Sequence, residues 1–201
     1  MAAANKLRDA DAREILSRAA LPPEARAALG NASEMPHMEM PDIAERLVSA
    51  GFLIEAARCY AHALPRREAV WWACMCALHT ARDDLPEPDR MAREAAESWV
   101  RSQSEESRRA AMELAGKIGF QSPEAWAAVG AFWSGPTLGP PGAPPNPPAP
   151  HLAGLAVAGA VALAAVRGEA SKRTARLGRF LVSARDIAAG GAGRIAAMDE
   201  A

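Results

Sequence analysis

Two Cys-x-x-His pairs are the residues of this sequence whose types and spacing best suit chemistry. They are Cys59 with His62, and Cys76 with His79. Residues three apart share one face of a helix, so each pair would present a thiol beside an imidazole. On two neighbouring helices these four ligands could form a tetrahedral zinc site. The usual knuckle of two cysteines in a tight loop is missing, and free cysteines commonly pack as small apolar residues. We therefore favour packing, with a small structural zinc-binding protein as an alternative.

Signatures of catalysis are missing from the sequence. It contains no Gly-rich phosphate loop, no nucleophile elbow and no His-Glu-x-x-His motif. The histidines lie in unrelated contexts, and the acidic stretch 83–89 lacks the glycine and the ligand spacing of a calcium loop. We expect no enzymatic activity, no catalytic residue and no cofactor.

Aromatic residues supply the candidate contact points for a protein partner. Trp71 and Trp72 are adjacent, so on a helix their side chains diverge by about 100°. One of them belongs in the core. The simpler interpretation is that the other Trp is buried as well. The functional interpretation is that it is a surface anchor for a partner, because Trp is enriched at binding hot spots. The candidate interaction residues are Tyr60, Trp71, Trp72 and Trp133.

Composition favours an all-α protein. Of the 201 residues, 50% are apolar and only 5% aromatic. Alanine, the best helix former, is the commonest residue, and no stretch alternates like a strand. The net charge of −1 gives no global attraction to nucleic acid or to an anionic membrane. Three cysteines and an N-terminus without an apolar signal core indicate the cytoplasm.

Helical periodicity and breakers divide the chain into three parts. Residues 1–134 are expected to form a body of antiparallel helical hairpins, with helices near 9–20, 22–30, 42–64 (a hairpin turning at Gly51), 68–80, 91–100, 104–118 and 122–134. Residues 135–150 hold half of the chain's 16 prolines and should be extended, largely polyproline II. This segment is a spacer, a ligand for an SH3-like or WW-like partner, or a strap anchored by Leu138.

The third part, 151–201, should be a helical pair that docks on the body and frays from about residue 190. The stretch 152–166 is shorter than the roughly 20 residues that span a bilayer, so a buried helix is favoured. The basic segment that follows could still lie on an anionic surface. Membrane anchoring through 152–187 is therefore a second functional class.

The hairpin at 42–64 resembles one tetratricopeptide-type unit. The residues that carry the resemblance are Ile43, Ala44, Leu47, Gly51, Ala56, Tyr60 and Ala63. Met40 stands where an aromatic is usual, and Glu68 stands where the closing proline should be. The pattern is not reproduced 34 residues further on, so we expect a solenoid-like arrangement of hairpins and not a true repeat array.

A second resemblance covers more of the chain. The segments that carry it are REAVWWACMC (67–76), FWSGPTLGPPGAPPNPPAPHL (132–152), AVAGAVALAAV (156–166) and RFLVSARDIAAG (179–190). Together they resemble an uncharacterised bacterial family associated with gene neighbourhoods of type VI secretion and its accessory adaptors. The resemblance implies an accessory or binding role and brings no catalytic residues. From the residues and this resemblance we expect a non-enzymatic adaptor that binds a protein partner.

Overall fold

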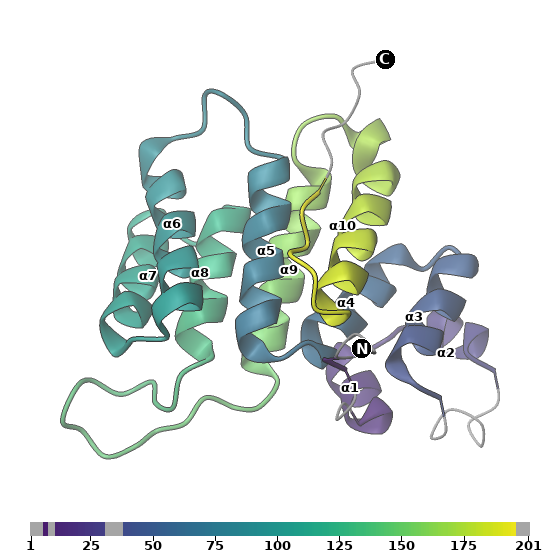
Figure 1. Ribbon diagram of the computed structural model, residues 1–201, viewed down its shortest axis with the longest axis horizontal. Helices are drawn as coiled ribbons and strands as arrows, with labels where there is room; N and C mark the ends of the chain where they lie inside the picture. Colours follow the sequence, from purple (N-terminus) through teal and green to yellow (C-terminus); the bar gives the residue numbers. More distant parts are fainter. Residues whose placement is uncertain (1–5, 8–10, 31–37, 196–201) are drawn as a thin grey trace.

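Every regular element of the structure, a computed structural model, is helical (Figure 1). The structure describes residues 6–7, 11–30 and 38–195, and this part of the chain contains no strand. The predicted all-α class is therefore confirmed. Parts of two expectations lie outside the described residues: the helix start near residue 9 and the tail 196–201. The helices are α1 (Ala12–Ala19), α2 (Pro23–Ala28), α3 (Met40–Ser49), α4 (Leu53–Ala63), α5 (Arg66–His79), α6 (Glu87–Ser102), α7 (Glu105–Lys117), α8 (Pro123–Trp133), α9 (Leu152–Val166), the 3-10 turn η2 (Ala170–Lys172) and α10 (Arg173–Ala188).

Local signals explain most of the helix ends. The side chains of Ser104 and Ser122 cap α7 and α8 by accepting hydrogen bonds from backbone N–H groups of the first turn. Helix α6 begins at Glu87, earlier than the predicted start at Met91. Pro88 interrupts nothing there, because the N–H that proline lacks has no partner in the first turn of a helix.

The hairpin predicted at 42–64 is present as α3 and α4. Gly51 forms its corner with a φ of 85°, a left-handed conformation that favours glycine. Ile43, Leu47 and Ala56 are fully buried at the contact between the two helices and the rest of the core. Small residues alternating with large ones therefore do allow close antiparallel packing.

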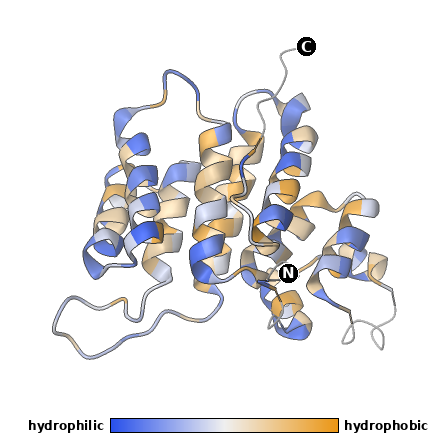
Figure 2. Ribbon diagram, viewed as in Figure 1, coloured by the Kyte–Doolittle hydropathy of each residue, from blue (hydrophilic) through white to orange (hydrophobic). Residues whose placement is uncertain are grey.

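Helix α9 lies in the middle of the molecule and does not merely dock on its surface. It packs against α8, α5, α4 and α10, and its contact with α8 is the most extensive between any two described helices. Figure 2 shows the reason, since α5 and α9 are mostly pale or orange while α6 and α7 carry many hydrophilic residues. A helix that is apolar all round belongs in the core. The core of the predicted body 1–134 is therefore completed by α9, which belongs to the third part of the chain.

The three central helices meet at Gly130. A Cβ added to this residue of α8 would lie 3.3 Å from Val157 Cγ2 on α9 and 3.5 Å from Val70 Cγ2 on α5. Glycine at this point lets the helices approach more closely than any side chain would.

Residues 190–195 follow α10 and fold back over it instead of fraying from residue 190 as predicted. Ser183 Oγ donates to Gly193 O at 2.6 Å, and Gly193 N donates to Asp186 Oδ2 at 2.7 Å. A Cβ on Gly193 would lie 2.4 Å from Ile187, so the segment rests directly on the helix. Gly193 allows this close contact because it has no side chain.

A candidate partner-binding face

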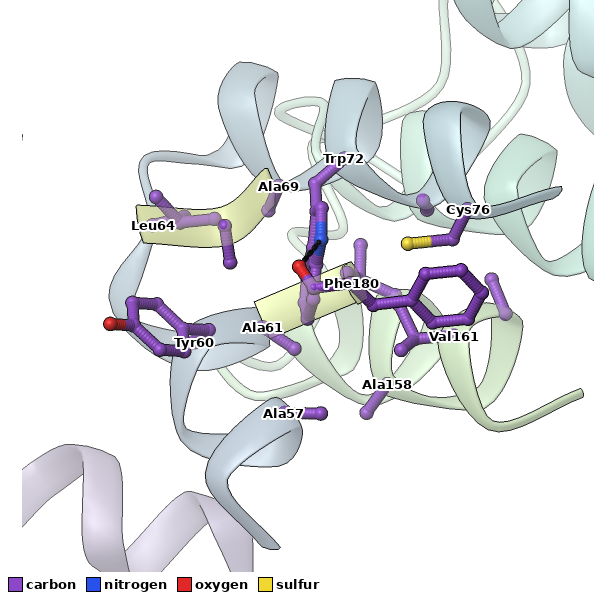
Figure 3. Packing of buried hydrophobic residues seen from close by; sticks show 14 of the residues in the cluster. Ala57, Tyr60, Ala61, Leu64, Ala69, Trp72, Cys76, Ala158, Val161 and Phe180 are labelled. Atoms are coloured by element: carbon purple, nitrogen blue, oxygen red, sulfur yellow. Dashed lines mark hydrogen bonds between the residues drawn. The ribbon is translucent and has the colours of Figure 1, made fainter. Parts of the chain in front are cut away.

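Two of the four predicted interaction residues, Tyr60 and Trp72, are core residues (Figure 3). Tyr60 is 1% exposed and Trp72 is fully buried, and their rings meet edge to face at 6.4 Å. Trp72 Nε1 donates to Phe180 O at 2.9 Å, which ties α5 to α10. Neither side chain can touch a partner in the folded protein. Their assignment as surface contacts is wrong, because α4 turns Tyr60 and α5 turns Trp72 toward each other in the core.

Trp71, the third predicted residue, lies on the outer side of α5 and is only partly buried. Its Nε1 donates to Ala192 O at 2.8 Å, so the indole also holds the segment 190–195 in place. Adjacent side chains diverge on a helix, so Trp72 lies in the core while Trp71 lies at the surface. This is the functional alternative that the sequence had left open for one of the two.

A pocket of about 270 Å³ opens beside Trp71. It lies where α5, the end of α6 and the end of α10 come together. Its lining residues are Lys6, Arg67, Glu68, Trp71, Val100, Arg101, Ile187 and Gly191. The wall is thus an indole and two aliphatic side chains, and the rim is charged. We call this hollow the Trp71 pocket.

The rim of the Trp71 pocket has three cations and one acid. Lys6 Nζ pairs with Glu68 Oε1 at 3.1 Å, so these two charges offset each other. Arg67 Nε donates to Val100 O at 2.9 Å and forms no ion pair with any described residue. The Arg101 side chain is 66% exposed and only loosely paired, 3.7 Å from Glu97. The two guanidinium groups give the pocket a positive rim.

Apolar side chains continue from the pocket along the outside of α5, and α6 adds one exposed methionine near the loop between the two helices. Trp71, Met75 and Leu78 share one face of α5, because they are spaced by four and three residues. Leu78 is 45% exposed, and Met91, across the short loop on α6, is 44% exposed. Since the helices are antiparallel neighbours (Figure 1), Leu78 and Met91 lie at the loop end and the Trp71 pocket at the other. We call this surface the α5–α6 face.

Residues 43–188 match the model of DUF6931, a family of unknown function. The chain belongs to this family. The match covers the α5–α6 face, the central helices and the proline-rich segment, but it assigns no activity. No curated protein and no solved structure matched the chain.

Trp133, the fourth predicted residue, lies away from the Trp71 pocket on α8. It is partly buried and meets Trp126 edge to face, with ring centroids 6.3 Å apart. Trp126 packs in turn on Gly159 of α9, and its Nε1 donates to Phe120 O at 2.9 Å. The structure therefore does not bring Trp71 and Trp133 into one site.

The Cys-x-x-His pairs do not assemble. The described residues contain no group of three or more His, Cys, Asp or Glu side chains placed to hold a metal ion. Cys59 and Cys76 are fully buried among apolar neighbours, and burial raises the pKa of the Cys59 thiol to about 12. A metal ligand must be a thiolate, so this environment opposes zinc binding. The two helices direct their pairs to different neighbours, so the structure does not bring the four predicted ligands together among the described residues.

The two histidines show those different neighbours. The His62 ring fills the space above Gly154 of α9, where an added Cβ would lie 2.2 Å from Nδ1. His79, at the end of α5, meets the Phe180 ring of α10 edge to face at 6.0 Å. Burial lowers the pKa of both imidazoles, with nearby arginines as a secondary cause.

The segment 152–187, proposed above as a membrane anchor, is folded into the core. Most apolar side chains of α9 are buried against α4, α5 and α8, and the apolar face of α10 carries the fully buried Phe180. No described helix combines the length and the hydropathy that crossing a bilayer requires. Anchoring by α9 would require this core to open.

A second, more polar pocket of about 410 Å³ lies at the other end of the central helices. The fully buried Glu124 accepts from Arg167 Nη1 at 2.8 Å near its base, and the same nitrogen reaches Ala77 O at 3.4 Å. Arg167 thus joins the end of α5, the start of α8 and the end of α9. This ion pair therefore connects three helices.

Sequence reasoning found Trp71 but missed the residues around it. Met75 and Leu78 follow Trp71 at helical spacing, so the sequence does contain a signal that they share its face of the helix. The contributions of Arg101, Ile187 and Gly191 carry no local signal, because they come from the ends of two other helices.

Proposed function

We propose that this protein is a non-enzymatic interaction module whose α5–α6 face binds a segment of a partner protein. The observation that carries the proposal is the Trp71 pocket, where a partly exposed indole lies in a hollow rimmed by two arginines. Trp and Arg are the residues most enriched at binding hot spots, and a hollow lets a partner side chain be desolvated.

The face favours an amphipathic helix with acidic residues at one end. From Trp71 to Leu78 the stripe is about 10 Å long, which matches two turns of a docked helix. Methionines such as Met75 and Met91 adapt to differently shaped apolar partners. Carboxylates on the partner would complement Arg67 and Arg101, and would speed association more than they tighten it.

The biological setting that we propose is that of an accessory or adaptor protein of a type VI-like secretion system, working in the cytoplasm. This part of the proposal depends on the sequence resemblance described above. The family that the chain belongs to has no assigned function. Adjacent genes that encode only metabolic enzymes would remove its support.

A capture experiment with surface variants tests the use of the face. The wild-type chain, Leu78→Asp and Met91→Asp serve as baits in an extract of the source cells, and captured proteins are identified by mass spectrometry. Both side chains are nearly half exposed, so the charged variants should keep the fold. Leu155→Asp is the matched control, since Leu155 is 49% exposed on α9, outside the face.

We expect a protein that the wild type and Leu155→Asp capture and that both α5–α6 variants lose. Arg101→Glu should weaken the same capture and make it less dependent on salt. Equal recovery of that protein by all baits would show that the α5–α6 face is not the binding site.

A further inference from the structure

The proline-rich segment stands off the helices as a closed loop (Figure 1). Leu138 N donates to Asn146 O at 2.7 Å, and Asn146 N donates to Thr137 Oγ1 at 2.9 Å. These two bonds close the loop near its base. Its tip is a turn in which Ala143 N donates to Pro140 O at 3.1 Å. Pro141 and Gly142, with a φ of 82°, occupy the central positions as in a type II turn.

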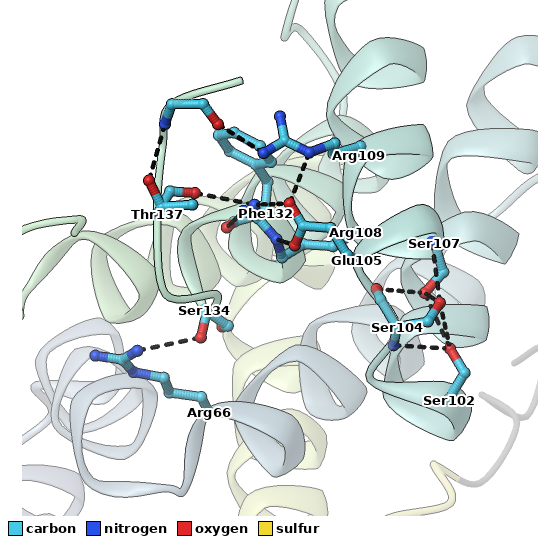
Figure 4. Close-up of polar contacts among 11 residues, drawn as sticks. Arg66, Ser102, Ser104, Glu105, Ser107, Arg108, Arg109, Phe132, Ser134 and Thr137 are labelled. Carbon is cyan, nitrogen blue, oxygen red and sulfur yellow. Dashed lines mark hydrogen bonds and ion pairs between the residues drawn. The ribbon is translucent and has the colours of Figure 1, made fainter. Parts of the chain in front are cut away.

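A buried arginine fixes the base of this loop (Figure 4). Arg108 is 1% exposed and donates to Phe132 O at 2.6 Å and to Thr137 O at 2.9 Å. Its guanidinium lies 4.4 Å from the centre of the Phe132 ring. Arg109 adds a bond to Gly139 O at 2.6 Å.

Glu105 holds both arginines in position. Its carboxylate accepts from Arg108 Nε at 2.7 Å and from Arg109 Nε at 2.6 Å. The hydrogen bond from Arg108 is the main cause that lowers the pKa of Glu105, so the carboxylate stays ionised. Burying a guanidinium is costly unless it is fully bonded, and here its bonds go to the loop base. The position of the loop is therefore specified by the helices.

The returning arm of the loop presents one free edge. Residues 144–149 have no helical or strand structure, and four of the six are prolines with fixed φ, which favours polyproline II with three residues per turn. Pro148 is buried, so the edge that it shares with residue 145 turns toward the body at Pro148, while Pro145 is exposed. The backbone O and N of Asn146 form the two hydrogen bonds that close the loop. Pro144 and Pro147 share the third edge, and both are exposed.

We propose that Pro144 and Pro147 form a pre-positioned ligand for a partner domain with an aromatic-lined groove. Two prolines one turn apart on a polyproline II edge are the element that such grooves recognise. The arm carries no charged side chain, so shape and ring stacking determine recognition. Holding the arm in its bound conformation lowers the entropy lost on binding. This site is separate from the α5–α6 face and does not depend on the function proposed for that face.

Titration of the full-length chain with a recombinant SH3 domain and a recombinant WW domain tests this proposal. We expect at least one probe to bind the wild type, and Pro144→Ala/Pro147→Ala to weaken that binding by about tenfold or more. The control Pro136→Ala/Pro140→Ala removes two exposed prolines from the outgoing half of the same segment, outside the edge, and should bind like the wild type.

Two further measurements test the positioning of the arm. Thr137→Val removes the closing hydroxyl without touching the edge and should weaken binding in part. A synthetic peptide of residues 136–150 should bind more weakly than the intact chain. The proposal is overturned if neither probe binds the wild type more tightly than the Pro144/Pro147 variant, if the control loses as much affinity, or if the peptide binds as tightly as the chain.

Discussion

At the scale of single residues, Arg167 illustrates how one side chain holds several elements. It neutralises the fully buried Glu124 and reaches the last carbonyl groups of α5. Arg167→Met would leave the carboxylate buried without a partner, so we expect the free energy of unfolding to fall by about 3 kcal/mol. Urea denaturation measures the change.

The matched control for this substitution is Arg82→Met. Arg82 lines the same pocket, but its pair with Asp84 is exposed on both sides. We expect a loss below about 0.5 kcal/mol there, because exposed ion pairs contribute little. Equal losses for the two variants would show that the buried pair has no special role.

Buried thiols determine a second prediction. Burial raises the pKa of Cys59 to about 12 and also raises the pKa values of Cys74 and Cys76. At pH 8 the native thiols stay protonated, so a thiol reagent such as DTNB should react with all three only after unfolding. In the unfolded chain the thiols ionise near pH 9, so stability should fall as the pH rises from about 9 to 12. Rapid labelling of the native protein at pH 8 would contradict this.

His62 lowers the stability of the protein on the acid side, whereas the cysteines lower it on the alkaline side. Burial, with smaller contributions from Arg18 and His151, lowers the pKa of its imidazole to about 4. Between pH 6.5 and 4 the imidazole is protonated in the unfolded chain but not in the native state. The free energy of unfolding therefore decreases as the pH is lowered through this range. We expect His62→Gln to reduce this slope in urea denaturation series. An NMR titration that gives His62 a pKa near 6.5 would refute the assignment.

At the scale of elements, the close packing of α5, α8 and α9 depends on Gly130. Gly130→Val would force a branched side chain against Val157 and Val70, and we expect a loss of about 2 kcal/mol from overpacking. The control is Gly178→Ala in α10, where an added Cβ meets nothing within 4 Å. That substitution should stabilise the protein by about 0.5–1 kcal/mol through helix propensity. Thermal unfolding of both variants compares the two effects, and stabilisation by Gly130→Val would contradict the packing.

At the scale of the whole molecule, residues 1–134 should not fold alone. Without α9 these residues lose the helix that α4, α5 and α8 pack around, and Val157 and Val161 leave a large apolar gap. We expect the fragment 1–134 to show helical circular dichroism without a cooperative thermal transition, while the full chain melts cooperatively. A sharp transition of the fragment would establish the body as an independent domain.

The helices of this protein could be predicted from local signals along the chain. Apolar periodicity, Pro65, Ser104, Ser122 and Gly51 act within a few residues, so they fixed element type, several boundaries and the hairpin of α3 and α4. The 15-residue length of the apolar stretch 152–166, too short for a bilayer span, also identified a buried helix correctly. These signals are local, and local signals can be read along the chain.

Which residues contact one another depends on how the helices pack, and the sequence carries no local signal for that. Periodicity says that a side chain is apolar but not which neighbour covers it, so it could not show that Tyr60 and Trp72 are core while Trp71 remains partly exposed. It could not bring Arg101 and Gly191 to Trp71, nor separate Cys59 from Cys76, because those distances depend on how distant helices pack. The position of α9 was equally hidden, since its role as the centre exists only once α4, α5 and α8 surround it.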